Sequence, residues 1–203
     1  MIHIDPSQLT ARERYRLMIS SIIPRPIALV TSIGNNGVIN AAPFSFFNGV
    51  TSSPPIISIS VGYRKGNAKD TARNIRERGE FVVNIVSESI AEKMNIASAE
   101  YPPEVSEISK ANLQIIPSEL VSPPRLAESP VHMECKLYKL IEIGEGPNDL
   151  ILGEVIRWHL NPDVKIDDRY HIDPESLKVI GRLGGPQYCT TNNIFEMVRP
   201  KVE

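Results

Sequence analysis

The pattern of apolar and polar positions predicts many short strands. Residues 27–33 form a run rich in β-branched side chains, and residues 56–62 alternate apolar with small polar ones. Residues 81–86 form a further apolar run. Residues 131–138 alternate as a long strand with one polar face, and residues 150–160 follow as a second long strand. We therefore expect a mainly β protein with peripheral helices.

Helical spacing is confined to short segments. Residues 10–19 open with a capping box, after which apolar residues recur at helical intervals. Residues 89–97 predict a second capped helix, which begins at Ser89. The segment 99–129 is rich in loops and paired prolines, with one short helix expected near residues 105–111.

Residues 40–55 have a composition that fits neither a core strand nor a solvated loop. A hairpin turn at residues 34–37 leads into this stretch, which combines small residues, three Phe and two blocks of Pro. Pro cannot donate to a sheet, and a solvated loop has little use for Phe. We interpret the stretch as a wall for a flat, apolar ligand with polar edges. A barrel corner followed by a turn is an equally good interpretation of the composition.

One face of the predicted strand 56–62 is unusually bare. It carries only Ser58, Ser60 and Gly62, whereas the other face is apolar. An exposed strand face usually carries larger side chains such as Thr, Lys or Glu. A face turned toward a ligand is therefore favoured over one turned toward solvent.

The loop that follows is a candidate phosphate site. A helix is predicted over residues 69–79, with Asp70 or Thr71 as its cap and a glycine at its end. Three cations lie in the loop or at the helix start: Arg64, Lys65 and Lys69. Free N–H groups at a helix N-terminus, together with these cations, favour a bound anion. The loop is not a Walker A motif, and a solvated basic turn remains the alternative.

Composition restricts the classes of function. A chain of 203 residues is expected to form one domain over residues 1–203. The net charge of −2 gives no basic surface for nucleic acid. No apolar run approaches the ~18 residues of a membrane span, and no signal peptide is evident, so a cytoplasmic protein is expected. Cys135 and Cys189 are far apart and are expected to be buried free thiols.

The sequence lacks the motifs of side-chain catalysis. There is no G-x-S-x-G elbow or Cys/His signature, and the four histidines do not have metal-ligand spacing. A G-x-G-x-x-G motif is also absent. What remains suits a flat heterocycle that carries a phosphate and supplies the chemistry itself.

Four segments, taken in order, carry a resemblance to a known family. They are P-R-P-I-A-L-V-T-S at 24–32, N-A-A-P-F-S-F-F at 40–47, Lys69-Asp70-Thr71 with Asn74-Ile75, and G-R-L-G-G at 181–185 with Tyr188. Together they resemble the flavin reductase-like family, nearest its flavoredoxin branch. The match spans roughly residues 14–200.

This resemblance implies an FMN-binding split β-barrel that works as a homodimer, with FMN near the subunit interface. The residues that it implies around the isoalloxazine are Asn40, Ala41, Ala42, Pro43, Phe44, Ser45, Phe46 and Phe47. The residues that it implies around the ribityl phosphate are Ser60, Gly62, Arg64, Lys69, Asp70 and Thr71. Among these, Arg64, Lys69 and Thr71 are expected to contact the phosphate, and Asp70 to cap the helix because a carboxylate would repel the phosphate.

The implied activity is hydride transfer from NAD(P)H to FMN and electron release to an unidentified acceptor, with no catalytic side chain or metal required. A flavoredoxin-type carrier reduced by a protein partner and a non-catalytic FMN-binding module are the alternatives. The run A-P-F-S-F-F differs from the T-x-N-S-F type of the two-component monooxygenase reductases. That difference argues against a dedicated monooxygenase partner and for FMN that stays bound.

Overall fold

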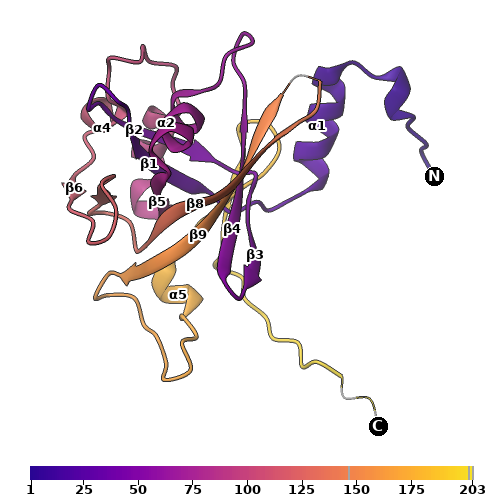
Figure 1. The fold of residues 1–203 in the computed structure, drawn as a ribbon. Helices are drawn as coiled ribbons and strands as arrows, with labels where there is room; N and C mark the ends of the chain where they lie inside the picture. Colours follow the sequence, from indigo (N-terminus) through magenta and orange to yellow (C-terminus); the bar gives the residue numbers. More distant parts are fainter. Residues whose placement is uncertain (146, 201, 203) are drawn as a thin grey trace.

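The chain folds around one antiparallel sheet of seven strands, in the order β2-β1-β5-β8-β9-β4-β3 (Figure 1). The computed structural model describes residues 1–145, 147–200 and 202. The strands of the sheet are β1 (Ala28–Ile33), β2 (Ile39–Phe44), β3 (Phe47–Ser52), β4 (Pro55–Gly62), β5 (Glu80–Ile85), β8 (Val131–Ile143) and β9 (Asn148–Leu160). Each strand predicted from the sequence is confirmed. The predicted turn after β8 includes residue 146, which lies outside the described residues.

Two small strand pairs complete the β structure. They are β6 (Ile115–Ile116) with β7 (Arg125–Leu126), and β10 (Ile180–Arg182) with β11 (Tyr188–Thr190). The first pair lies within the segment that the sequence predicted as loop-rich. Its strands are too short to produce a periodic pattern, so sequence reasoning did not detect them.

The sheet curls into a barrel, and the connection between β2 and β3 is its corner. These strands lie at opposite edges of the sheet, although only Ser45 and Phe46 separate them in sequence. The two edges must therefore approach each other. Ser60 N donates a 2.9 Å hydrogen bond to Phe46 O, which joins the corner to β4. The barrel corner that the composition allowed is thus present.

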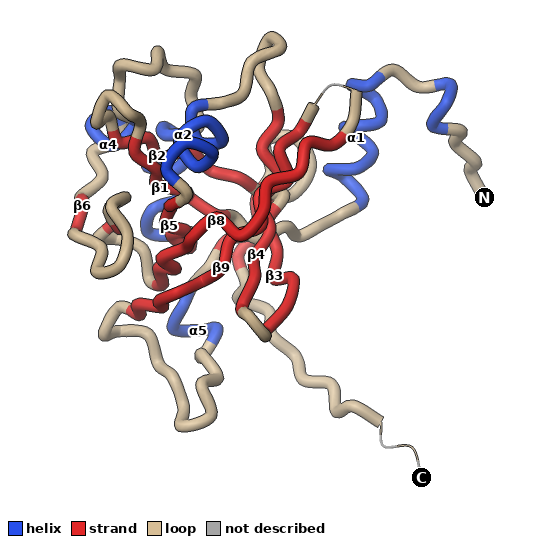
Figure 2. The backbone as a smooth tube through the Cα atoms, viewed as in Figure 1, coloured by secondary structure: helices blue, strands red, loops and turns tan. Residues whose placement is uncertain are grey.

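The helices surround this sheet. They are α1 (Ala11–Ser21), α2 (Asp70–Arg78), α3 (Ala91–Ala97), α4 (Glu107–Lys110) and α5 (Pro174–Leu177), with 3-10 turns at Pro6–Gln8 and Glu88–Ile90. In Figures 1 and 2, α1 lies on the other side of the molecule from α2 and α4. The predicted capping box of α1 is confirmed, because Glu13 N donates to Thr10 Oγ1 and Thr10 N donates to Glu13 Oε2. No helix in the described part of the chain is long and apolar enough to cross a membrane.

Two of the predicted helix caps are wrong. The N-cap residue of α2 is Lys69, whose side chain makes no capping hydrogen bond, and Asp70 instead pairs with Arg73 within the helix. The cap predicted for α3 is also absent, because a 3-10 turn precedes that helix and Ser89 Oγ bonds Ser87 Oγ at 2.9 Å. In each case the side chain expected to cap the helix binds another side chain nearby, Arg73 for Asp70 and Ser87 for Ser89.

The sheet has an apolar core on each face. Ala28 and Val30 of β1 belong to the core inside the barrel, whereas Leu29 belongs to the core under α3 and α4. This alternation is the period of two that a strand imposes. An ion pair of 2.8 Å between Arg76 and the buried Asp149 holds α2 against β9.

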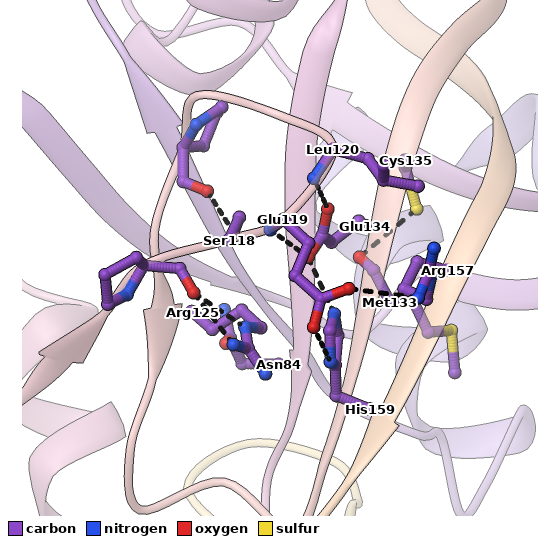
Figure 3. Close-up of polar contacts among 12 residues, drawn as sticks. Asn84, Ser118, Glu119, Leu120, Arg125, Met133, Glu134, Cys135, Arg157 and His159 are labelled. Carbon is purple, nitrogen blue, oxygen red and sulfur yellow. Dashed lines mark hydrogen bonds and ion pairs between the residues drawn. The ribbon is translucent and has the colours of Figure 1, made fainter.

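The polar face predicted for β8 is buried at its start, which corrects the expectation from the sequence (Figure 3). His132 and Glu134 are 4% and 0% exposed, because the chain around residues 117–126 folds over them. Glu134 accepts hydrogen bonds from the backbone N–H groups of Glu119 and Leu120, at 2.8 and 2.6 Å. It also bonds His159 Nε2 at 2.7 Å. Partners remote in sequence thus satisfy a carboxylate that alternation alone would place in solvent.

Candidate functional site

A cavity of about 500 Å³ opens between the end of β2, the N-terminus of α2 and the chain that connects α3 to α4. The β2 side of the cavity is apolar, because Ala42, Pro43 and Phe44 line it. Pro43 has no N–H to donate to a neighbouring strand. The sheet tolerates it because β2 is an edge strand. The cavity therefore has one apolar wall built on a strand.

The outer edge of β2 is covered by the start of α4. Ser106 Oγ donates a 2.5 Å hydrogen bond to Ile39 O, and Glu107 Oε2 accepts one from Ala41 N at 3.0 Å. Glu107 is only 8% exposed and lines the cavity. Burial raises the pKa of the Glu107 carboxyl above its usual value, although the bond from Ala41 acts in the opposite direction. These two side chains hold the apolar wall in place.

The N-terminus of α2 forms another side of the cavity. Since Lys69 makes no capping bond, the N–H groups of the first helical turn keep their capacity to bind a ligand. Thr71 is buried, and its Oγ1 accepts a 2.9 Å hydrogen bond from Asn40 Nδ2, which ties α2 to β2. Free N–H groups and the positive end of the helix dipole favour an anion here.

Positive charge gathers at this end of the cavity. The cations that line it are Arg64, Lys65, Lys69 and Arg73. Two of them are neutralised within the protein, because Arg64 pairs with Glu100 and Arg73 pairs with Asp70. The ammonium groups of Lys65 and Lys69 form no hydrogen bond or ion pair with any described residue. These two lysines are therefore free to bind an anionic ligand.

A tight turn brings Arg64 and Lys65 to the cavity. Arg64 and Asn67 exchange two backbone hydrogen bonds, of 2.7 and 2.9 Å. Lys65 and Gly66 between them take the left-handed conformation, with φ of 48° and 79°. The glycine is needed at the second of these positions because it adopts a positive φ without strain.

The cavity unites part of the site predicted from the sequence. The predicted residues that line it are Asn40, Ala42, Pro43, Phe44, Arg64, Lys69, Asp70 and Thr71. The predicted residues that do not line it are Ala41, Ser45, Phe46, Phe47, Ser60 and Gly62. Contact between any of these residues and a flavin stays a prediction.

The residues outside the cavity have structural neighbours of their own. Ser45 accepts a 3.3 Å hydrogen bond from the buried guanidinium of Arg25, and the ring of Phe46 lies 6.5 Å from that of Tyr15 in α1. Arg25 also donates to Leu183 O at 2.9 Å. The barrel corner is thereby joined to α1 and to the C-terminal segment.

The glycine-rich C-terminal segment packs closely against its own chain. A Cβ on Gly181 would lie 2.7 Å from Pro24 Cβ, and one on Gly184 would lie 2.9 Å from Ser20 Oγ. These two glycines therefore let the segment lie close to the end of α1 and to the chain that follows it.

Several cavity residues were missed by sequence reasoning. The segment between α3 and α4 contributes Glu100, Tyr101 and Pro103, and α4 contributes Glu107. The sequence shows these residues only as part of a loop-rich excursion. No periodicity or motif marks them, because their role depends on contacts with β2 and the Arg64 turn.

The described residues offer no second centre of chemistry. They include no group of three or more His, Cys, Asp and Glu side chains placed to hold a metal ion. Cys135 and Cys189 are free thiols, and burial raises the pKa of the Cys135 thiol strongly, so it is not an available nucleophile. Cys189 is only partly buried, which differs from the expectation of two buried thiols.

Comparisons with known proteins identify the family and the fold. A family model described as "Flavin reductase like domain" matches residues 19–173. The chain is 42% identical to nitrilotriacetate monooxygenase component B from Bacillus cereus, with a TM-score of 0.93 over 97% of this chain and 98% of that one. It is 37% identical to the 2-nitrobenzoate 2-nitroreductase NbaA of Pseudomonas fluorescens, with a TM-score of 0.90 over 98% and 96% of the two chains.

More distant structures share the fold. A split barrel protein from Shewanella frigidimarina has a TM-score of 0.85 at 19% identity, over 98% of this chain and 100% of that one. A flavoredoxin of Desulfovibrio vulgaris (Miyazaki F) has a TM-score of 0.73 at 22% identity, over 87% and 91% of the two chains. The predicted mainly β split barrel is confirmed, and the chain belongs to the flavin reductase-like family.

Proposed function

We propose that this protein is an FMN-dependent oxidoreductase that uses NAD(P)H as reductant. The observation that carries the proposal is one cavity in which an apolar strand wall lies beside the N-terminus of α2. Two lysines that line this cavity have no partner for their ammonium groups among the described residues. A phosphate-bearing aromatic ligand needs this combination, because its ring requires an apolar surface and its phosphate requires donors and positive charge. A family model of flavin reductases that matches residues 19–173 supports the same conclusion.

The residues of the cavity have separate roles in this proposal. Lys69 and the first turn of α2 bind the phosphate, and Lys65 adds a second positive charge. Ala42 to Phe44 receive the ring, and the hydrogen bond between Asn40 and Thr71 keeps this wall and the phosphate site at a fixed spacing. When bound, FMN would supply the redox chemistry, accepting a hydride from the nicotinamide and passing the electrons to an acceptor.

Two acceptors are favoured by particular relatives. The relative at 42% identity is named as a monooxygenase component, which favours delivery of reduced flavin to an oxygenase and is at odds with the expectation from the A-P-F-S-F-F run. The relative at 37% identity is named as a nitroreductase, which favours a nitroaromatic acceptor used at the bound flavin. If the protein releases reduced flavin during turnover, the oxygenase is supported as acceptor. If the flavin stays bound through turnover, the nitroaromatic acceptor is supported.

A homodimer in the cytoplasm belongs to the same proposal. Apolar side chains of α1 and of its C-cap residue are exposed, and a second copy of the chain would cover them: Tyr15 at 55%, Met18 at 46% and, at the cap, Ile22 at 57%. Two free thiols suit a reducing compartment.

The test is anaerobic mixing of the purified, FMN-loaded protein with NADH and with NADPH, followed by flavin absorbance. We expect rapid bleaching with at least one nucleotide, because the proposed reaction needs only bound flavin and a stacked nicotinamide. A protein that binds FMN but is bleached by neither nucleotide would be a carrier reduced by another protein or a non-catalytic FMN-binding module. A protein that binds no flavin would contradict the proposal as a whole.

A further inference from the structure

One acidic side chain lies where an anionic ligand is expected. Glu100, in the chain between α3 and α4, lines the cavity and pairs with Arg64 in the turn after β4. The two residues come from segments that are far apart in sequence. Their side chains are 67% and 43% exposed, so both can move to other partners.

The second ion pair of the cavity differs from this one. Asp70 and Arg73 are three residues apart on α2, so their pair is local to the helix. The Arg64–Glu100 pair instead joins two loops that have no helix or strand in common. Among the cations that line the cavity, Arg64 is thus the one that pairs with a carboxylate from another segment of the described chain.

We propose that Glu100 is an internal competitor of the ligand phosphate, which occupies Arg64 in the unliganded protein and gives it up when a phosphate binds. This inference rests on the proposed function. A phosphate carries nearly two negative charges and three acceptor oxygens, so it competes well for a guanidinium held by a single exposed carboxylate. A flavin without a phosphate has no anionic group that could replace the Glu100 carboxylate at Arg64. Glu100 therefore weakens the binding of a phosphorylated flavin and leaves the binding of a flavin without a phosphate unchanged.

The inference predicts how a neutral side chain changes binding. Glu100→Gln removes both the competition for Arg64 and the repulsion of the phosphate. Such exposed charge interactions alter affinity by about threefold to tenfold at low salt. We expect the Kd of FMN to fall by about this factor, and the Kd of riboflavin, which has no phosphate, to stay unchanged. High salt should reduce the gain, because it screens the charges.

The experiment is a fluorescence titration of flavin-free protein with FMN and with riboflavin, at low and high salt. Glu104→Gln is the matched control, since Glu104 is exposed on the same loop, loses the same charge and does not line the cavity. The double variant Arg64→Gln/Glu100→Gln, compared with Arg64→Gln, tests whether Glu100 acts through Arg64. In that background the gain from Glu100→Gln should be smaller.

The outcomes are separable. Tighter FMN binding by Glu100→Gln, but not by Glu104→Gln, supports the competition. Unchanged or weaker FMN binding would overturn it, because Glu100 would then have no role or would position Arg64 for the phosphate. An equal gain for riboflavin would also overturn it, since that ligand has no phosphate. A wild-type protein that binds no FMN would remove the proposed function itself.

Discussion

Two properties of Lys69 support the proposal that it is the main phosphate-binding residue. It is the N-cap residue of α2, and its ammonium group has no partner among the described residues. Replacing it with Gln removes one charge from the phosphate site and leaves the apolar wall intact. We expect Lys69→Gln to weaken FMN binding by about 1–2 kcal/mol at low salt, the scale of one charge-assisted hydrogen bond.

The measurement is the Kd of FMN as a function of salt concentration. The variant should lose part of the salt dependence that the wild type has, because fewer charges are then screened. Lys136→Gln is the control, since Lys136 is exposed on β8 and does not line the cavity. A salt dependence equal to that of the wild type would contradict a phosphate contact at Lys69.

The pH dependence of the stability that Glu107 contributes tests how this residue supports the cavity wall. Its folded pKa is raised above the model-compound value of 4.5, so the folded protein binds its proton more tightly than the unfolded chain does. The stability that wild-type Glu107 contributes is therefore present below about pH 4.5 and is lost as pH rises through the raised folded pKa. Glu107→Gln stays neutral and keeps an oxygen for Ala41 N–H.

We expect Glu107→Gln to gain stability relative to the wild type as pH rises through this window, as measured by urea unfolding at a series of pH values. Glu107→Ala instead leaves Ala41 N–H without an acceptor and should cost about 1–3 kcal/mol at every pH. A pH-independent difference between the wild type and Glu107→Gln would show that the carboxyl is not desolvated.

At the residue scale, the sequence indicated those residues of the cavity whose signal is local in the chain. Lys69 and Thr71 are next to a helix start, and Ala42 to Phe44 form a continuous run, so both groups could be found. Glu100 and Glu107 could not be found, because their partners Arg64 and Ala41 are tens of residues away in sequence. Phe46 does not line the cavity, and its ring lies 6.5 Å from that of Tyr15, so its contact with a flavin stays a prediction.

The strands were predictable as elements, and the burial of their polar positions was not. Alternation located β8 correctly, but it assigned His132 and Glu134 to an exposed face. What buries them is the 117–126 chain, whose backbone N–H groups need the Glu134 carboxylate. Two helix caps were predicted wrongly for a local reason, because Asp70 pairs with Arg73 and Ser89 bonds Ser87.

The carboxylate of Glu134 in β8 is expected to make the stability of the protein depend on pH in the acid range. Burial by itself would raise the pKa of the Glu134 carboxyl, but two backbone donors and His159 lower it overall. Because the folded pKa lies below the value of 4.5, the stability contributed is present above about pH 4.5 and is lost as pH falls through the folded pKa.

Glu134→Gln should therefore destabilise the protein by about 2 kcal/mol near neutral pH, the scale of a hydrogen bond to a charged group. The gap from the wild type should close as the pH falls through the folded pKa. Denaturant unfolding measures the gap, and Glu154→Gln on neighbouring β9 is the control. If the gap stayed constant down to strongly acidic pH, the ionised carboxylate would not be the source of the stability.

At the scale of the whole molecule, the exposed apolar side chains of α1 predict self-association. We expect sedimentation velocity to give twice the chain mass of 22.6 kDa. Met18→Glu places a charge in the proposed interface and should weaken the dimer, whereas Ile115→Glu, on the small pair β6 and β7, should not. A wild-type monomer at micromolar concentration would contradict the expected assembly.

The most direct test of the central claim is a crystal structure of the protein with FMN. We predict the ring against Ala42 to Phe44 and the phosphate at the N-terminus of α2, within hydrogen-bonding distance of Lys69. A flavin bound elsewhere, or one whose phosphate lies away from α2, would contradict the account.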